Sequence, residues 1–225
     1  MVYNCFMKKE IVIFDLDGTL LNTLEDLTDS TNFALDSCSF SKRTLDEVRN
    51  FVGNGVYMLI ERAVPKNTSK DKIESCLAIF KKHYSNNMYN KTSPYIGILK
   101  MLEYLKENGY KIAVVSNKFD SAVKELCEKY FKGFIDYSAG ENEAAGIRKK
   151  PAPDTVLKVL KNFNLNCAQA VYVGDSEVDI LTAKNSKIPC ISVTWGFKSK
   201  EFLVKNQAKY IAETPQEIIE ILKSL

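Results

Sequence analysis

Two carboxylates separated by a single residue, Asp15 and Asp17, directly follow the apolar run 11–14. Such a pair cannot be both buried and ionised without compensation, so it predicts a bound cation or a shared proton. A divalent metal ion is the simpler of the two. One carboxylate can act as a nucleophile while the other delivers and later removes a proton. Gly18, which is followed by Thr19, allows a sharp turn close to metal and substrate.

The same stretch does not fit a calcium-binding loop. That loop needs a glycine at position six and a glutamate at position twelve. Counted from Asp15, these positions hold Leu20 and Asp26. An ordinary Asp-Gly turn after a strand is the remaining alternative.

Ser116 and Asn117 follow a second apolar run, 112–115. A serine hydroxyl and free backbone amides at the start of a helix form a phosphate-binding cradle. An ordinary helix N-cap, made by either side chain, is the alternative interpretation.

Two lysines, Lys149 and Lys150, precede the proline-punctuated stretch 151–154. An ammonium group is a compact charge that can neutralise phosphate oxygens and a nucleophile together. Taken alone, the residues favour a solvated charge run with Asp154 as the next N-cap.

A third apolar run, 170–173, leads into Asp175, and Asp179 lies one helical turn further on. This spacing turns both carboxylates toward the same side. Oxygen ligands suit Mg²⁺, which keeps several waters and uses substrate phosphate as a ligand. Ser176 and Asp179 also fit a capping box, and Asp179 can serve both purposes.

Repeated strand and helix segments must position these residues. The strands are expected at 11–14, 111–118, 134–140, 169–175 and 189–195. Their alternation with helices predicts an α/β fold with a doubly wound parallel sheet. Ligands bind beyond the carboxyl ends of such strands, where the carboxylates and Ser116 fall.

Residues 21–93 contain helical patterns and no convincing strand. We therefore predict an all-helical cap domain at 21–93, hinged near Asn22 and Ser93, and a core domain at 1–20 and 94–225. Helix starts are predicted at three capping sites, Thr44 with Glu47, Thr68 with Asp71, and Thr214 with Glu217.

The sequence resembles the haloacid dehalogenase superfamily of phosphotransferases. Four motifs in the family's order carry the resemblance, namely DLDGTL from Asp15, SNK from Ser116, KPAP from Lys150, and GDSEVD ending at Asp179. The resemblance implies that Asp15 is the nucleophile and that Asp17 is the general acid and base. Relatives that keep their phosphorylated aspartate carry a threonine in place of Asp17, so this residue favours hydrolysis.

The resemblance also implies the remaining roles. Ser116 becomes the phosphate ligand, together with Asn117, and Lys150 rather than Lys149 neutralises the phosphate. The expected direct ligands of Mg²⁺ are Asp15, the backbone carbonyl of Asp17, and Asp175. Asp179 is expected to bind the metal through water, and Thr19 to contact substrate.

The predicted cap resembles that of phosphoglycolate phosphatases, in which a GNG loop precedes a helix ending in ERA. This implies substrate contacts from Gly53, Asn54 and Arg62. A plain interhelical turn is an equally good interpretation of the loop, and a surface ion pair is favoured for Arg62. A WGF turn at 195–197 adds to the resemblance. Leu27 stands where sugar phosphomutases of this family carry a histidine.

Composition excludes several classes of protein. The chain has 225 residues, six cysteines without a CxxC pair, one histidine, and a net charge of +3 from scattered lysines. These features argue against a zinc site, a disulfide framework and a basic surface for binding nucleic acid. No run is long enough to cross a membrane and the opening residues do not form a secretory signal. We expect a cytoplasmic monomer or weak homodimer that begins at Met1 or Met7.

The sequence therefore predicts a Mg²⁺-dependent phosphatase. It would hydrolyse a small phosphorylated metabolite through an aspartyl phosphate, most like a phosphoglycolate phosphatase. A pyrophosphatase or nucleotidase of the same superfamily is one alternative. A binding module that keeps the fold without turnover is another, and the intact motif residues argue against it.

Overall fold

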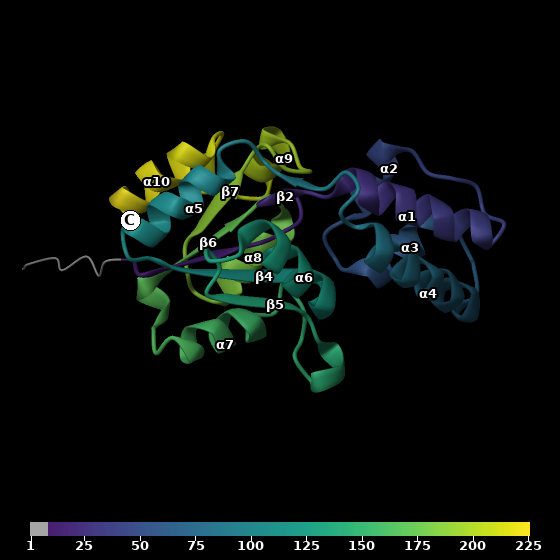
Figure 1. The fold of residues 1–225 in the computed structure, drawn as a ribbon, viewed down its shortest axis with the longest axis horizontal. Helices are drawn as coiled ribbons and strands as arrows, with labels where there is room; N and C mark the ends of the chain where they lie inside the picture. Colours follow the sequence, from purple (N-terminus) through teal and green to yellow (C-terminus); the bar gives the residue numbers. More distant parts are fainter. Residues whose placement is uncertain (1–8) are drawn as a thin grey trace, which may run out of the picture.

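The computed structural model describes residues 9–225 and contains a six-stranded parallel sheet (Figure 1). Every neighbouring pair of strands in this sheet runs parallel. In sheet order the strands are β5 (Tyr137–Glu141), β4 (Lys111–Phe119), β1 (Ile11–Phe14), β6 (Ala170–Gly174), β7 (Cys190–Val193) and β8 (Tyr210–Ala212). The predicted fold is confirmed. The edge strand β8 was missed because three residues carry too little pattern.

Helices cover both faces of the sheet, as a doubly wound fold requires (Figure 1). They are α5 (Ile98–Glu107), α6 (Asp120–Phe131), α7 (Asp154–Asn162), α8 (Glu177–Asn185), α9 (Lys200–Lys205) and α10 (Pro215–Ser224). Side chains alternate along the central strand β1. Ile11 and Ile13 pack in one cluster with α7, whereas Val12 and Phe14 pack in another with α5 and α10. Both faces are therefore buried, which explains the uninterrupted apolar run.

Four helices are inserted between β1 and α5 and lie beyond one end of the sheet (Figure 1). They are α1 (Leu24–Ser37), α2 (Leu45–Phe51), α3 (Val56–Ala63) and α4 (Lys70–Asn87). Two short strands that we did not predict, β2 (Leu21–Asn22) and β3 (Ser93–Pro94), pair antiparallel at the two connections. The inserted helical unit is thus present, and its expected extent of 21–93 stays a prediction.

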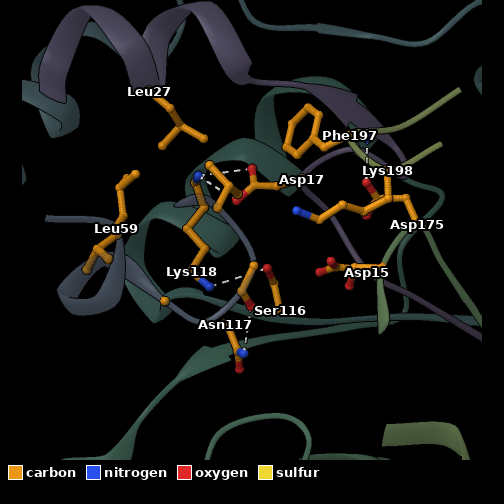
Figure 2. A pocket seen from close by; sticks show the side chains of 15 residues that line it. Asp15, Asp17, Leu27, Leu59, Ser116, Asn117, Lys118, Asp175, Phe197 and Lys198 are labelled. Carbon is orange, nitrogen blue, oxygen red and sulfur yellow. Dashed lines mark hydrogen bonds and ion pairs between the residues drawn. The ribbon is translucent and has the colours of Figure 1, made fainter. Parts of the chain in front are cut away.

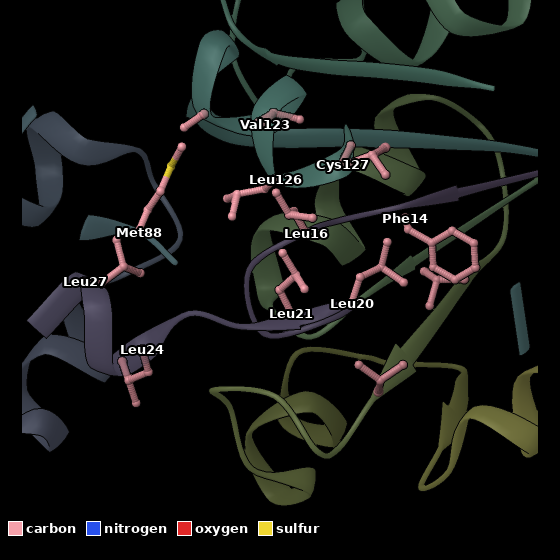
Figure 3. Close-up of a cluster of buried hydrophobic side chains, with 14 of the residues drawn as sticks. Phe14, Leu16, Leu20, Leu21, Leu24, Leu27, Met88, Val123, Leu126 and Cys127 are labelled. Carbon is pink, nitrogen blue, oxygen red and sulfur yellow. The ribbon is translucent and has the colours of Figure 1, made fainter. Parts of the chain in front are cut away.

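A continuous buried cluster joins the sheet to the insert (Figure 3). It runs from Phe14 through Leu20 and Leu21 to Leu24 and Leu27 of α1, and none of these five is more than 4 % exposed. Burial of a leucine side chain stabilises a fold by about 1.5–3 kcal/mol. Apolar packing therefore anchors α1 immediately after the carboxylate pair.

Two of the three predicted helix starts are confirmed. Thr44 and Glu47 form a capping box for α2, and Thr214 caps α10 by accepting the Glu217 N–H. The third is wrong, because α4 starts after Ser69. The Thr68 hydroxyl instead donates to the Pro65 carbonyl at 2.7 Å, which closes the preceding turn.

The five cysteines in the described part of the chain are free thiols. Cys5 and the two candidate start residues lie outside the described residues. Within residues 9–225, no helix is long and apolar enough to cross a bilayer.

Candidate active site

A cavity lies where β1, β4 and β6 end, between the sheet and the helical insert (Figure 2). Because these strands are parallel neighbours with β1 in the middle, residues at their carboxyl ends meet at one edge. The core contributes polar groups and the insert contributes mainly apolar ones. The lining residues are Asp15, Asp17, Ser116, Asn117, Lys118, Asp175, Ser176, Phe197 and Lys198 from the core, and Leu27, Val52, Gly53, Gly55, Val56 and Leu59 from the insert.

Asp15 occupies the end of the central strand. Its backbone N–H donates to the Val173 carbonyl at 2.9 Å, and its side chain lies 2.9 Å from the Lys150 ammonium group. Burial raises the pKa of Asp15 to about 6, against the opposing attraction of Lys150. Repulsion by Asp179 and Asp17 adds to the increase. The pKa of Asp15 therefore lies closer to neutral pH than that of an ordinary aspartate, and Lys150 is the cation beside it.

Three buried carboxylates, those of Asp15, Asp175 and Asp179, have oxygens within 4.8 Å of one another. Burial, followed by repulsion from the other two, raises the pKa of Asp175 well above its ordinary value. One oxygen of Asp175 accepts the Phe197 N–H at 2.6 Å. Three close carboxylates in a buried site suit a divalent cation, since the Lys150 charge alone does not neutralise them.

Asp179 caps a helix and also lies in the carboxylate cluster. One carboxylate oxygen accepts hydrogen bonds from the Ser176 backbone at 3.1 Å and hydroxyl at 2.6 Å, which caps α8. The other lies 2.8 Å from the Lys150 ammonium. The capping box therefore holds this carboxylate in place beside the other two.

Lys150 is the buried member of the lysine pair. Its ammonium contacts Asp15, Asp179 and the Tyr172 hydroxyl, the last at 3.0 Å. Burial alone would lower the pKa of Lys150, but the two carboxylates outweigh it and raise the pKa well above its ordinary value. Lys149 points elsewhere and pairs with Glu143 at 3.2 Å.

Ser116 and Asn117 line the cavity, but not at a helix start. Strand β4 continues to Phe119, and α6 begins only at Asp120, so neither residue caps the helix. The expectation of a cradle at a helix N-terminus is wrong for this reason. The Asn117 side chain instead donates to the carbonyls of Gly53 and Lys150, each at 3.0 Å, and accepts the Lys150 N–H at 2.8 Å. It thereby ties the lysine loop to the helical insert.

Asp17 is not part of the carboxylate cluster. Both of its oxygens lie 3.0 Å from the Lys118 ammonium, and one accepts the Thr23 hydroxyl at 2.7 Å. We assigned Lys118 no role from sequence. Its position two residues after Ser116 in β4 was the available signal, because alternate strand residues point to the same face.

On the insert side, only part of the predicted set reaches the cavity. Gly53 lines it, whereas Asn54 and Arg62 do not. The Arg62 guanidinium donates to the Asn54 side chain at 2.8 Å and to the Phe51 carbonyl at 2.7 Å. These hydrogen bonds stabilise the loop between α2 and α3. Thr19 also lies outside the lining and is 1 % exposed.

Residues 12–193, most of the chain, match the family model for the haloacid dehalogenase-like hydrolases. The chain belongs to this family. The four motifs that carried the resemblance lie within the matched residues.

Relatives of this haloacid dehalogenase-like hydrolase cover nearly its whole length. It is 34 % identical to a phosphoglycolate phosphatase of Psychrobacter arcticus, over 85 % of this chain and 86 % of the relative. Identity is 31 % with phosphoglycolate phosphatase 1 of Pseudomonas aeruginosa, over 96 % and 78 %. A crystal structure from Lactobacillus delbrueckii subsp. bulgaricus superposes with a TM-score of 0.90 at 35 % identity, covering 96 % of this chain and 99 % of the other.

Proposed function

We propose that this chain is a Mg²⁺-dependent phosphatase of small phosphorylated metabolites, similar to phosphoglycolate phosphatase. The observation that carries the proposal is the contact of Asp15 with Lys150 beside two further buried carboxylates at the end of the sheet. The names of the relatives support phosphoglycolate as the substrate. The insert lines the cavity mainly with apolar side chains, whereas the charged groups come from the core.

The proposed reaction has two steps on the protein's own groups. A carboxylate oxygen of Asp15 attacks phosphorus, the bond to the leaving oxygen breaks, and that oxygen takes a proton from Asp17. Asp17 then removes a proton from water, whose oxygen attacks the phosphoryl group and restores the Asp15 carboxylate. Lys150 holds positive charge beside the nucleophile, and Ser116 offers its hydroxyl to a phosphoryl oxygen.

Asp15 and Asp175 would hold Mg²⁺, with the Asp17 backbone carbonyl, and Asp179 would act through water. When bound, the ion supplies positive charge to the phosphoryl oxygens. The three buried carboxylates fit this requirement because they carry more negative charge than Lys150 balances.

We also propose that residues 21–93 form a cap that covers the site. The hydrogen bond between the Asn117 side chain and the Gly53 carbonyl links the two units at the cavity. A covered site excludes water and strengthens charge interactions within it.

A phosphate-release assay tests the activity. Substrates should include 2-phosphoglycolate, pyrophosphate, nucleoside monophosphates and sugar phosphates, each with Mg²⁺ or with a chelator. We expect 2-phosphoglycolate to have the highest kcat/KM, and the chelator to abolish turnover. A preference for pyrophosphate or nucleotides would assign one of the alternative activities, and no release from any ester would identify a binding module.

Asp15→Asn tests the nucleophile. The variant should lose hydrolysis of an aryl phosphate while keeping the circular dichroism spectrum and unfolding midpoint of the parent. Unchanged turnover would remove the assignment of Asp15.

A further inference from the structure

Lys198 lines the cavity but has no role in the proposed reaction. It follows the WGF turn after β7, is partly exposed, and lines the same cavity as Asp15 and Asp17. In Figure 2 its amine points into the space between these two aspartates. No carboxylate within residues 9–225 lies at ion-pair distance from it.

The other lysines near the reacting groups are already engaged. Lys118 contacts both oxygens of Asp17, and Lys150 contacts Asp15 and Asp179. Lys198 therefore differs from them in offering a positive charge that no protein group in the described part of the chain neutralises.

The position of Lys198 is set by its neighbours in the chain. The backbone N–H of Phe197 donates to Asp175 at 2.6 Å, which fixes the loop against the carboxylate cluster. The ammonium also lies 5.6 Å from the ring centre of Phe202, within the range of a cation–π contact. The charge is consequently placed beside the reaction centre before substrate arrives.

The surroundings define what this ammonium can bind. Leu27, Val56 and Leu59 of the insert line the cavity with apolar surface. Apolar walls lower the local dielectric, so a charge pair formed there is stronger than one in water. An anionic group on the leaving alcohol would find its counter-charge at Lys198 and at no other unpaired lining residue.

We propose that Lys198 binds the carboxylate of the substrate's leaving group and so selects phosphorylated hydroxy acids over uncharged phosphate esters. This inference rests on the proposed function. Lys150 and Ser116 serve the phosphoryl group at the end of the sheet, which leaves Lys198 for the second anion.

The test compares 2-phosphoglycolate with ethyl phosphate, in which a methyl group replaces the carboxylate. The Mg²⁺-loaded full chain, Lys198→Met and Lys205→Met are assayed with both substrates. Lys205 is an exposed lysine on the adjacent helix α9 and is the matched control. The measured ratio is kcat/KM for 2-phosphoglycolate divided by kcat/KM for ethyl phosphate. We expect Lys198→Met to lower this ratio by at least about tenfold, and Lys205→Met to leave it unchanged.

Charge reversal sharpens the result. Lys198→Glu should shift preference toward phosphoethanolamine, whose leaving group carries a cation. An unchanged ratio in Lys198→Met would overturn the proposal. Equal losses on both substrates would also overturn it, because they would make Lys198 a phosphoryl contact.

Binding provides a measure that does not need turnover. Calorimetry compares Asp15→Asn with the double variant that also carries Lys198→Met. We expect the second substitution to weaken binding of 2-phosphoglycolate by at least about tenfold more than it weakens binding of ethyl phosphate. If the parent hydrolyses no ester but this difference persists, the proposed activity fails while the carboxylate subsite stands. If hydrolysis occurs without the difference, only the subsite fails.

Discussion

The ammonium of Lys118 lies 3.0 Å from each carboxylate oxygen of Asp17, while its other side faces the ring of Tyr84 from α4, with 4.5 Å to the ring centre. Burial alone would lower the pKa of Lys118, but the attraction of Asp17 outweighs it and raises the pKa. Lys118 is therefore a charged residue held between the proposed acid and the helical insert. Its contacts hold both carboxylate oxygens of Asp17.

Replacing Lys118 by methionine should lower kcat at least about tenfold with a smaller change in KM, because Asp17 loses the cation that orients both of its oxygens. Steady-state kinetics on an aryl phosphate measures the split. Lys124→Met, which removes an exposed lysine paired with Asp120, is the control. Equal kcat values for the two variants would contradict a positioning role.

Lys150→Met should destabilise the protein by about 3–5 kcal/mol, because it leaves two buried carboxylates without their cation. Its neighbour offers a comparison within the same loop. Lys149→Met removes a partly exposed pair with Glu143 and should cost about 1 kcal/mol or less. Denaturant unfolding of both variants in the metal-free state measures the two losses of stability. Similar losses would show that burial of Lys150 does not make its removal more costly than that of Lys149.

Metal affinity should depend on pH. The pKa of Asp15 is raised from 3.8 to about 6, so between these values the metal-free folded state binds more protons than the unfolded state. The stability of the metal-free protein then falls as pH rises through this range. Mg²⁺ must displace those protons, so it should raise the unfolding temperature more at about pH 8 than at about pH 5.

Thermal unfolding with Mg²⁺ and with a chelator at several pH values measures this effect. Asp15→Asn, which removes the titrating group, should flatten much of the dependence. A stabilisation by Mg²⁺ that is independent of pH would show that the carboxylates are not its ligands.

Two glycines of the helical insert test whether close packing of the insert against the core is needed for turnover. Gly53 and Gly55 both have positive φ, +126° and +88°, so alanine strains the backbone at either position. A Cβ at Gly55 would also lie 3.3 Å from the Asn117 carbonyl oxygen, whereas one at Gly53 would meet nothing within 4 Å. The kcat/KM of Gly55→Ala should therefore be lower than that of Gly53→Ala by roughly fivefold or more.

Comparable unfolding midpoints for the two variants would confirm that the kinetic difference reflects the packing of the insert against the core rather than a loss of stability. Comparable kcat/KM values would instead show that the close approach of Gly55 to Asn117 has no part in turnover.

Local patterns in the sequence predicted the parallel sheet, the helical insert and several of the polar residues that line the cavity. Each apolar run is buried on both faces of the sheet, and Asp15, Ser116 and Asp175 each lie in or directly after such a run, which makes their shared edge predictable. The helical period of 21–93 likewise depends on neighbouring residues only. By contrast, β8 and the pairing of β2 with β3 involve segments too short to carry a pattern.

Tertiary structure alone decided which side chains meet. The residues by themselves could not separate Lys149 from Lys150, nor show that Arg62 turns to Asn54 instead of the cavity. The contact of Lys118 with Asp17 depends on how β4 lies beside β1. The placement of Lys198 depends on the loop after β7, a strand that lies on the opposite side of β1 from β4. Sequence determines which chemical groups follow each strand. The distances between groups on different strands depend on register and long-range packing, which no local stretch of sequence encodes.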